Sequence, residues 1–258
     1  MKKRLDVLLV ERGLAETRSQ AQALVIAGLV PGYDKPGIQL HESVSLEVER
    51  PPRFVSRGGE KLAHALELLL VDPAGKDCLD IGASTGGFTD CLLQSGAARV
   101  IALDVGYGQL HPRLRSDDRV TVLERVNARN VTSLPFAPEI VVCDVSFISV
   151  KTALPPLLRL AAPGWQALVL VKPQFEAGRA NAPKGVVRDP AVRHRVLHDV
   201  CVASATWGSA EWGSKVAGVV DSGLPGPKGN REFLVHLIDS PEPTDTDELD
   251  RWIDDAVG

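Results

Sequence analysis

The chain contains no run of apolar residues as long as the ~18 that a membrane-spanning helix requires. Its longest apolar segment, residues 154–171, is interrupted by two prolines, by Arg159 and by the pair Pro163-Gly164. Residues 1–6 carry charge, but no apolar segment follows them, as it would in a secretory signal. The sequence therefore predicts a cytoplasmic protein that does not engage a membrane.

Spacings typical of metal and disulfide sites are missing too. His194 and His198 are four residues apart on a predicted helix, but no third ligand accompanies them. The cysteines form no C-x-x-C pair and lie mostly in apolar runs, which predicts buried free thiols. They are Cys78, Cys91, Cys143 and Cys201. We therefore expect neither a bound metal nor a disulfide.

The chain lacks the overall positive charge of many nucleic-acid-binding proteins, because its net charge is −4. Residues 239–258 hold eight acidic residues and one basic residue, a charge of −7, so the rest of the chain carries +3. Residues 172–195 hold six basic and two acidic residues. Such a patch attracts phosphates, although an ordinary solvated face can have the same composition.

Four apolar runs lead into charged residues. The runs are residues 78–79, 100–103, 140–143 and 167–171, and the charged residues are Asp80, Asp104, Asp144 and Lys172. The intervening segments are long enough for crossover helices, so the pattern predicts an α/β fold with a mostly parallel sheet between helices. Ligands of such sheets bind beyond the carboxyl ends of the strands, which would bring these four charges to one cleft.

The first fifty residues are predicted to form a separate module. Their pattern predicts two helices and then two β-like runs, at residues 4–12, 17–28, 38–40 and 44–48. Pro51-Pro52 marks a stiff linker. In the acidic tail, Leu249, Trp252 and Ile253 suit one face of a short helix. We predict three segments, residues 1–55, 56–240 and 241–258.

Several segments of the module agree with a known domain in both spacing and residue type. They are Arg4-Leu5-Asp6-x-x-Leu9, Gly13-Leu14, Thr17-Arg18-Ser19-x-Ala21, Ile26-x-Gly28-Leu29-Val30 and Lys35-Pro36-Gly37. In these segments the module resembles the S4 RNA-binding domain. That family usually has a V-x-V-[ND]-G turn after the second helix, and the corresponding turn here, residues 30–34, is shortened. The resemblance implies RNA contacts by Arg4, Arg18 and Lys35, and the short turn bears on affinity more than on fold.

A glycine-rich segment, residues 80–89, lies between a predicted strand and a predicted helix. Its spacing matches neither the G-x-G-x-x-G fingerprint nor a P-loop, and it has no basic residue to hold a triphosphate. Glycine lets the backbone turn sharply and approach a ligand closely. Asp104 ends the next strand about 20 residues later, where a carboxylate can bind ribose hydroxyls.

An Asp-x-Gly-x-x-x-Gly-Gly loop followed by an acidic strand end resembles the S-adenosylmethionine site of Rossmann-like methyltransferases. The resemblance implies that Asp80 lies near the methionine moiety, that Asp104 takes the ribose and that Asn127 lies near the adenine. The other cofactor-binding residues that it implies are Gly82, Ala83, Ser84, Gly86, Gly87 and Phe88.

Four charged residues far apart in the chain are predicted to converge. Asp144 and Lys172 end neighbouring strands, and Lys61 begins the helix before the first strand. Glu232 precedes a late strand, residues 233–238, which reaches the same edge if it runs antiparallel. This Lys-Asp-Lys-Glu set resembles the tetrad of the FtsJ/RrmJ-like 2′-O-methyltransferases of RNA.

The segments around these residues narrow the resemblance. They are residues 55–62, 80–89, 143–149, 171–176 and 225–232. Together they resemble the TlyA family, which joins an S4 domain to an FtsJ-like domain and 2′-O-methylates cytidines of ribosomal RNA. The resemblance covers nearly the whole chain. It implies a Rossmann-like methyltransferase sheet with an antiparallel last strand, S-adenosylmethionine as cofactor, and ribosomal RNA or subunits as partners.

A ribose 2′-hydroxyl is a poor acid and must lose its proton as it attacks the methyl carbon. A lysine can act as the base when burial and a nearby cation lower its pKa. Lys172 is the predicted base and Lys61 the neighbouring cation, with Asp144 and Glu232 orienting them. The sulfonium is already an activated leaving group, so the reaction requires no metal. RNA contacts are predicted for Arg57, Arg179, Lys184 and Arg188.

Three other interpretations stay open at this stage. A non-catalytic RNA-binding assembly factor would keep the fold, and a cofactor-binding measurement would distinguish it. A membrane-active haemolysin, a label that proteins of this family have carried, has no span, export signal or pore-like segment here to support it. A small-molecule methyltransferase would have no use for the S4-like module. We expect a monomer, and the nucleotide, the ribosomal subunit and the coupling through the linker stay open.

Overall fold

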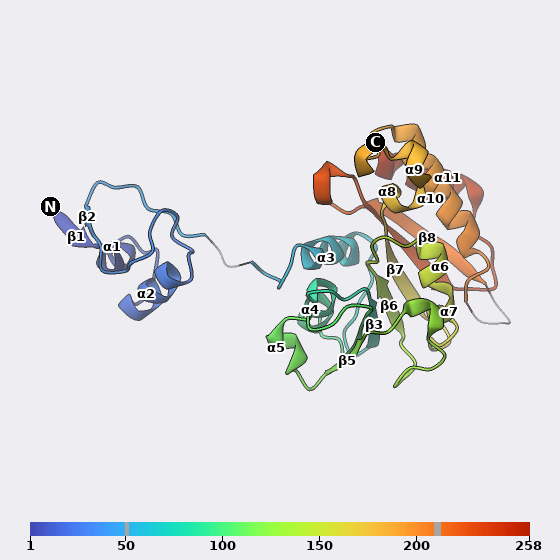
Figure 1. Ribbon diagram of the computed structural model, residues 1–258, viewed down its shortest axis with the longest axis horizontal. Helices are drawn as coiled ribbons and strands as arrows, with labels where there is room; N and C mark the ends of the chain where they lie inside the picture. The colour runs from blue at the N-terminus through green and yellow to red at the C-terminus, as the bar shows by residue number, and fades with distance from the viewer. Residues whose placement is uncertain (50–51, 209–212) are drawn as a thin grey trace. The chain divides into compact units, whose positions relative to one another are not determined.

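The computed structural model describes residues 1–49, 52–208 and 213–258, except for the side chains of Arg179 and Pro227. The chain divides into two compact units, Met1–Arg53 and Phe54–Gly258, both drawn in Figure 1. This division lies two residues before the boundary predicted from the sequence. Residues 50 and 51 of the predicted linker lie outside the described residues.

Two helices pack against each other in the N-terminal unit, α1 (Leu5–Glu11) and α2 (Arg18–Ile26). Thr17 caps α2, because its side chain accepts a hydrogen bond from the Gln20 backbone N–H at 3.2 Å. The core of the unit includes Leu5, Leu9, Ala21, Val25 and Val30. Both helices lie where the apolar spacing predicted them.

One predicted strand of this unit is wrong. Residues 44–48 form no strand, and β2 (Gln39–His41) pairs instead with β1 (Lys2–Arg4) in an antiparallel sheet. The backbone N–H of Val44 donates to the carbonyl oxygen of His41, at the end of β2, and the N–H of Glu49 donates to that of Leu29, which follows α2. An alternating pattern therefore does not produce a strand where no neighbouring strand accepts its hydrogen bonds.

A seven-stranded sheet forms the centre of the C-terminal unit, in the order β5-β4-β3-β6-β7-β9-β8. Strands β3 to β7 are parallel, whereas β9 runs antiparallel to both of its neighbours. The predicted α/β class, with a mostly parallel sheet and an antiparallel last strand, is confirmed. The strands are β3 (Asp77–Ile81), β4 (Arg99–Asp104), β5 (Val120–Glu124), β6 (Ile140–Cys143), β7 (Gln166–Val171), β8 (Ser214–Asp221) and β9 (Phe233–Asp239).

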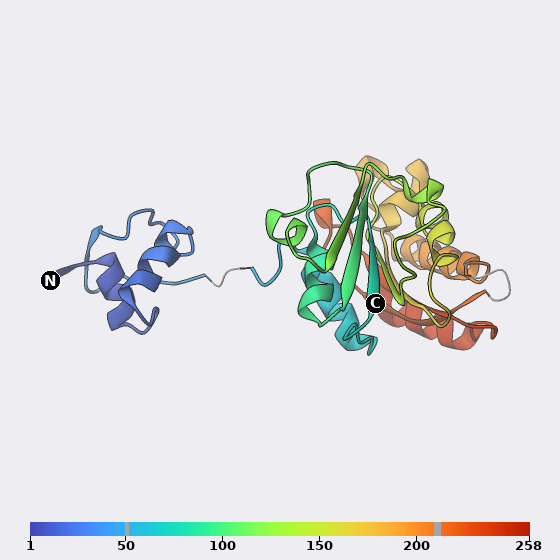
Figure 2. The same ribbon diagram turned by 90° about the horizontal axis from the view of Figure 1, so that it is seen from below.

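Helices cover both faces of this sheet, as Figures 1 and 2 show. One face carries α3 (Gly58–Leu68), α4 (Gly87–Gln94) and α5 (Pro112–Arg115). The other carries α6 (Val150–Ala153), α7 (Pro155–Leu158), α10 (Pro190–Ser204) and α11 (Thr246–Val257). Short helices complete the unit: η1 (Ala128–Asn130), α8 (Pro173–Glu176), α9 (Gly178–Asn181), η2 (Pro183–Gly185) and η3 (Pro227–Gly229). In the described part of the chain, none of the helices has the length and apolar character that crossing a bilayer requires.

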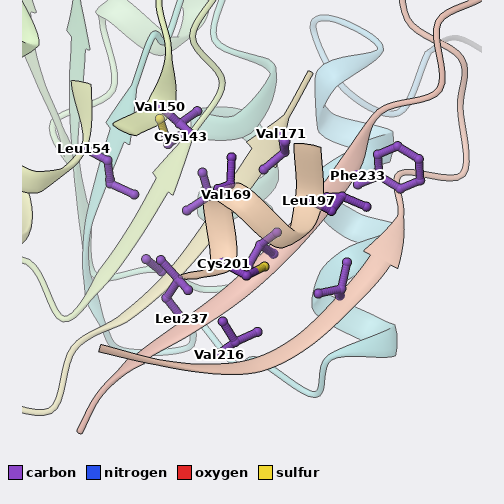
Figure 3. Close-up of a cluster of buried hydrophobic side chains, with 14 of the residues drawn as sticks. Cys143, Val150, Leu154, Val169, Val171, Leu197, Cys201, Val216, Phe233 and Leu237 are labelled. Atoms are coloured by element: carbon purple, nitrogen blue, oxygen red, sulfur yellow. The ribbon is translucent and has the colours of Figure 1, made fainter. Parts of the chain in front are cut away.

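Alternate residues of the strands enter two hydrophobic clusters, one on each face of the sheet. Val141 and Val169 pack with α6, α7, α10 and α11, whereas Val142 and Leu168 pack with α3 and α4. Figure 3 shows part of the first cluster, with Cys201 of α10 among strand side chains. All four cysteines are buried, as predicted. Burial on both faces explains why these strands are continuous apolar runs.

The acidic C-terminal segment ends in α11, which packs against β8 and α10. Asp245 caps this helix, because its Oδ1 accepts a hydrogen bond from the Glu248 backbone N–H at 3.0 Å. Leu249 and Ile253 are buried in the core, whereas Trp252 is only partly buried. The helix therefore belongs to the C-terminal unit, and its acidic side chains face away from the cluster.

Candidate active site

Five elements bring charged side chains to one edge of the sheet. The parallel strands β4, β6 and β7 end there, at Asp104, Asp144 and Lys172. Because β9 runs in the opposite direction, the residue before it, Glu232, lies at the same edge. Lys61, in the first turn of α3, reaches this carboxylate. The structure thus brings the four tetrad residues together, as two ion pairs.

Lys61 and Glu232 form the more deeply buried pair. Lys61 Nζ lies 2.5 Å from Glu232 Oε2, and the two side chains are 9% and 1% exposed. The other carboxylate oxygen accepts a hydrogen bond from Gln174 Nε2 at 3.1 Å. Removing one partner of such a pair leaves an unpaired buried charge, at a cost of about 3–5 kcal/mol. This pair therefore links α3, α8 and the start of β9.

Lys172 and Asp144 form the second pair, their charged atoms in direct contact. Lys172 Nζ also donates a hydrogen bond to Ser146 Oγ at 2.9 Å. The side chains of Lys172 and Asp144 are 11% and 26% exposed, so this pair is less deeply buried than the first. Each lysine has its own carboxylate, an arrangement that the sequence did not predict.

The glycine-rich loop between β3 and α4 depends on glycine at two positions. Gly82 has a φ of +83°, and a Cβ there would lie 2.6 Å from the backbone oxygen of Asp144. Gly86 has a φ of +96°, and a Cβ there would lie 2.3 Å from the Leu114 side chain. Only glycine combines this backbone conformation with such close approaches, so it lets the loop fold against β6 and α5.

Asp104, at the end of β4, fixes the same loop. Its Oδ2 accepts a hydrogen bond from the Ser84 backbone N–H at 2.8 Å, and its Oδ1 accepts one from the Gly106 N–H at 2.6 Å. A carboxylate has about four lone-pair sites, so two further donors can still be accommodated. Two adjacent hydroxyls of a ribose are donors of that kind.

Two adjoining cavities lie along this edge. The larger has a volume of about 520 Å³ and is lined by Asp104 and Asn127, among others. The smaller has a volume of about 170 Å³, and its lining includes Ser56, Ala83, Gly87, Phe88 and Lys172. The residues that line both are Gly82, Ser84, Asp144 and Ser146. The Lys172–Asp144 pair therefore lies where the two cavities meet.

Two family models match the chain. One, described as FtsJ-like methyltransferase, matches residues 54–238, and the other, described as S4 domain, matches residues 3–30. A Mycobacterium tuberculosis (strain H37Rv) protein named 16S/23S rRNA (cytidine-2′-O)-methyltransferase TlyA is 46% identical over 244 residues, 91% of this chain and 89% of that protein. The chain belongs to the TlyA family of FtsJ-like methyltransferases.

Other TlyA-like proteins extend the comparison. YqxC of Bacillus subtilis (strain 168), named as a candidate rRNA methyltransferase, is 49% identical over 245 residues, 92% of this chain and 85% of YqxC. A solved structure of a Streptococcus thermophilus protein, named as a candidate hemolysin, is 40% identical with a TM-score of 0.74 and covers 99% of this chain and 95% of its own. The fold of the whole chain is therefore shared with a solved structure.

Two residues of the predicted cofactor site line neither cavity in this TlyA-family chain. Gly86 instead lets the loop pack closely against the Leu114 side chain. Asp80 is fully buried beneath the loop, where its Oδ2 accepts hydrogen bonds from the Thr89 N–H at 2.9 Å and from Thr89 Oγ1 at 2.6 Å. Its Oδ1 has no hydrogen-bond partner among the described residues. Asp80 therefore holds the start of α4 in place below the cavity.

The stability of the protein is expected to fall as the pH rises towards neutrality, because of Asp80. Burial is the main cause that raises the pKa of this carboxyl from 3.8 to about 7. The folded state binds this proton more tightly, so the stabilisation is complete below the unfolded pKa and is lost as the pH rises to about 7. Asp80→Asn cannot ionise at this position. Between about pH 5 and pH 8, the free energy of unfolding should therefore fall by on the order of 2–3 kcal/mol more in the wild type than in this variant. Urea unfolding at both pH values measures this, and equal losses would contradict it.

Asn127 has a local bond as well as a place in the larger cavity. Its Oδ1 accepts a hydrogen bond from the Arg129 backbone N–H at 3.1 Å and so caps η1. Asn127 is thus a turn residue that also lines the larger cavity. Of the whole predicted cofactor set, the residues that line a cavity are Gly82, Ala83, Ser84, Gly87, Phe88, Asp104 and Asn127.

Arg4 and Arg18, predicted to contact RNA, hold a buried carboxylate in the N-terminal unit. Arg4 donates two hydrogen bonds to Asp6, at 3.0 and 2.9 Å, and Arg18 donates one at 3.0 Å. The side chain of Asp6 is fully buried, but those of Arg4 and Arg18 remain 40% and 55% exposed. Both arginines therefore stabilise the unit, and their contact with RNA stays a prediction, as it does for the exposed Lys35.

The predicted RNA contacts of the C-terminal unit are solvent-facing where they are described. Arg57 is exposed at the N-cap of α3, and Lys184 and Arg188 are exposed after α9. The side chain of Arg179 lies outside the described part of the chain. No group of three His, Cys, Asp or Glu side chains within the described residues is arranged to hold a metal ion.

Sequence reasoning missed three residues of the site. Ser146 contacts Lys172, and Gln174 contacts Glu232. Phe147 lines the larger cavity with its side chain 90% exposed and a φ of +66°, and its ring lies 5.1 Å from that of Phe175. Ser146 and Gln174 each stand two residues beyond a predicted site residue. The turn after a strand end is therefore the signal that would have found them.

Proposed function

We propose that this chain transfers a methyl group from S-adenosylmethionine to the 2′-hydroxyl of a cytidine in 16S or 23S ribosomal RNA. The observation that carries the proposal is the Lys172–Asp144 pair at the junction of the two cavities. The Mycobacterium tuberculosis relative, which is named as a 16S/23S rRNA (cytidine-2′-O)-methyltransferase, supports the substrate and the atom that is methylated. The S4 match over residues 3–30 supports RNA as the acceptor.

The residues present fit S-adenosylmethionine. Asp104 has lone pairs left for the ribose hydroxyls, and Asn127 lies in the same cavity for the adenine. Gly82 has no Cβ to crowd the passage between the cavities, and Ala83, Gly87 and Phe88 line the smaller one, where the methionine part would bind. When bound, the cofactor supplies a methyl group on a sulfonium, which is an activated leaving group.

Lys172 acts on the acceptor in this proposal. Its Nζ takes the proton of the ribose 2′-hydroxyl as the oxygen attacks the methyl carbon. Asp144 and Ser146 hold that amine at the junction through the contacts described above. Holding the hydroxyl, the base and the methyl donor in line supplies much of the rate enhancement.

Lys61, Glu232 and Gln174 act as positioning residues. Val171 and Phe233 are paired across β7 and β9, so Lys172 and Glu232 extend side by side from these strands. Glu232 is held to α3 by its buried ion pair with Lys61 and to α8 by its hydrogen bond from Gln174. This support limits the movement of Lys172 without contact with the substrate.

The test is tritiated methyl transfer from S-adenosylmethionine to purified ribosomal subunits that lack the modification. Label in RNA that survives alkaline hydrolysis as a dinucleotide identifies a 2′-O-methyl group, because the modified ribose can no longer attack its own phosphate. A base methyl group would instead appear in a mononucleotide. If the cofactor binds but no subunit or free RNA takes label, the proposed acceptor is wrong, and a non-catalytic RNA-binding role becomes the better account.

A further inference from the structure

The C-terminal unit contains the sequence Pro-Lys-Gly twice, and both copies have the same backbone conformation. One forms η2 (Pro183–Gly185) and the other η3 (Pro227–Gly229). Lys184 and Lys228 lie in the left-handed region, with φ values of 55° and 61°. The glycines that follow them also have positive φ, 76° and 78°. Two turns of the same shape therefore each present a lysine at the tip.

The two turns are fastened to each other although they are about 44 residues apart. Lys228 Nζ donates a hydrogen bond to the Lys184 carbonyl oxygen at 3.3 Å. Asn230, which is 3% exposed, donates to the Gly185 carbonyl oxygen at 2.9 Å and accepts from the Val187 N–H at 3.0 Å. A buried asparagine thus holds one turn against the other, and the pair forms a single rigid platform.

Lysine is an unfavourable residue for both tips. A non-glycine residue in the left-handed region is strained because its Cβ crowds the backbone, a strain that glycine avoids. The strain cannot be explained by packing, because both lysine side chains are exposed. Residues held in such conformations tend to cluster at functional sites. Lysine at each tip provides an exposed ammonium group, which glycine in the same conformation would not provide.

The platform adjoins the proposed active site. Gly226, in the same loop as Lys228, packs on the Glu232 carboxylate so closely that a Cβ there would lie 2.0 Å from Oε1. Its N–H donates a hydrogen bond to the Asn230 carbonyl oxygen at 2.8 Å, which closes the loop over that carboxylate. The loop of the second turn therefore lies beside Glu232, and neither lysine lines the cavity of Asp104 and Asn127.

No acidic side chain in the described ranges forms an ion pair with Lys184, Lys228 or the nearby exposed Arg188. Exposed, unneutralised ammonium groups on a rigid backbone are suited to phosphate. We infer that the paired Pro-Lys-Gly turns bind the RNA backbone phosphates that flank the methylated nucleotide. This inference rests on the proposed function, and it adds Lys228 to the RNA-binding residues that the sequence suggested.

Double replacement by glycine, Lys184→Gly with Lys228→Gly, tests the platform. Glycine suits both φ values, and this relief of strain offsets the loss of the Lys228–Lys184 hydrogen bond, so the thermal midpoint should stay close to that of the wild type. Lys184→Arg with Lys228→Arg keeps both charges, and Lys76→Gln removes a lysine before β3, at the opposite edge of the sheet. We would measure binding of unmethylated ribosomal subunits at several KCl concentrations, with S-adenosylhomocysteine present.

The glycine variant should bind roughly 10- to 100-fold more weakly, with a salt dependence shallower by about 1–2 in log–log slope, since each lost phosphate contact releases about one counterion fewer. The arginine variant and Lys76→Gln should stay close to the wild type. Wild-type affinity and slope in the glycine variant would overturn the inference. If the wild type binds subunits but methylates no 2′-hydroxyl, the proposed chemistry fails, while a loss of binding in the glycine variant would still support the phosphate platform.

Discussion

Lys172→Ala is expected to lower the turnover number for methyl transfer by roughly 10²–10⁴-fold, the range that general base catalysis contributes. The physical reason is the position of Nζ at the junction of the two cavities, in contact with Asp144 and Ser146. Cofactor affinity should change far less, because Lys172 does not line the larger cavity, where the ribose and the adenine would bind. Single-turnover transfer of tritiated methyl groups to ribosomal subunits, with calorimetry for cofactor binding, measures both.

Lys172→Arg is the matched control for this prediction. Arginine keeps a cation beside Asp144 but cannot be deprotonated in a protein, so it cannot take the hydroxyl proton. Its turnover number should therefore be as low as that of the alanine variant. An arginine variant with more than about a tenth of wild-type activity would show that Lys172 supplies only a positive charge, a lesser effect than general base catalysis.

Gly82→Ala is expected to weaken cofactor binding by on the order of 100-fold, because a misplacement of about 1 Å at a site can cost that much. The new Cβ would lie 2.6 Å from the Asp144 backbone oxygen, so the loop or the end of β6 must move. Either movement displaces a residue that lines both cavities. Calorimetric titration with S-adenosylhomocysteine measures the loss.

Gly75→Ala separates the clash from the backbone strain. Gly75 has a φ of +72°, close to that of Gly82, but a Cβ there would meet nothing within 4 Å. Both variants should lose stability by similar amounts from the strain, about 1–2 kcal/mol. Only Gly82→Ala should lose cofactor affinity. Equal affinities in the two variants would mean that the loop accommodates the added methyl group.

The parallel sheet could be predicted because its strands are buried on both faces. Val141 and Val142 face opposite clusters, so neither can be polar, and the strand reads as an unbroken apolar run. The charges at the strand ends could be predicted to converge for the same reason, since parallel strands end at one edge. Glu232 joined them only through the antiparallel direction of β9, which the family resemblance supplied.

The partners within the site could not be predicted in this way. Whether Lys61 pairs with Glu232 or lies beside Lys172 depends on side-chain directions that differ by a few ångströms. Arg4 illustrates the same limit. The sequence pattern around an arginine that pairs with a buried aspartate, as Arg4 does with Asp6, is the same as that around an arginine that binds RNA. Such pairings require the relative placement of elements distant in the chain.

The sequence by itself determined the two-unit organisation, the α/β class and the residue types gathered at one sheet edge, because these follow from local apolar spacing and from strand direction. Only the tertiary structure decided that the tetrad divides into two separate ion pairs, that Asp80 supports the loop from below, and that Lys184 and Lys228 share one platform. These features depend on distances of a few ångströms between segments far apart in the chain. Periodicity carries no information about such distances, since they are set by how the elements pack.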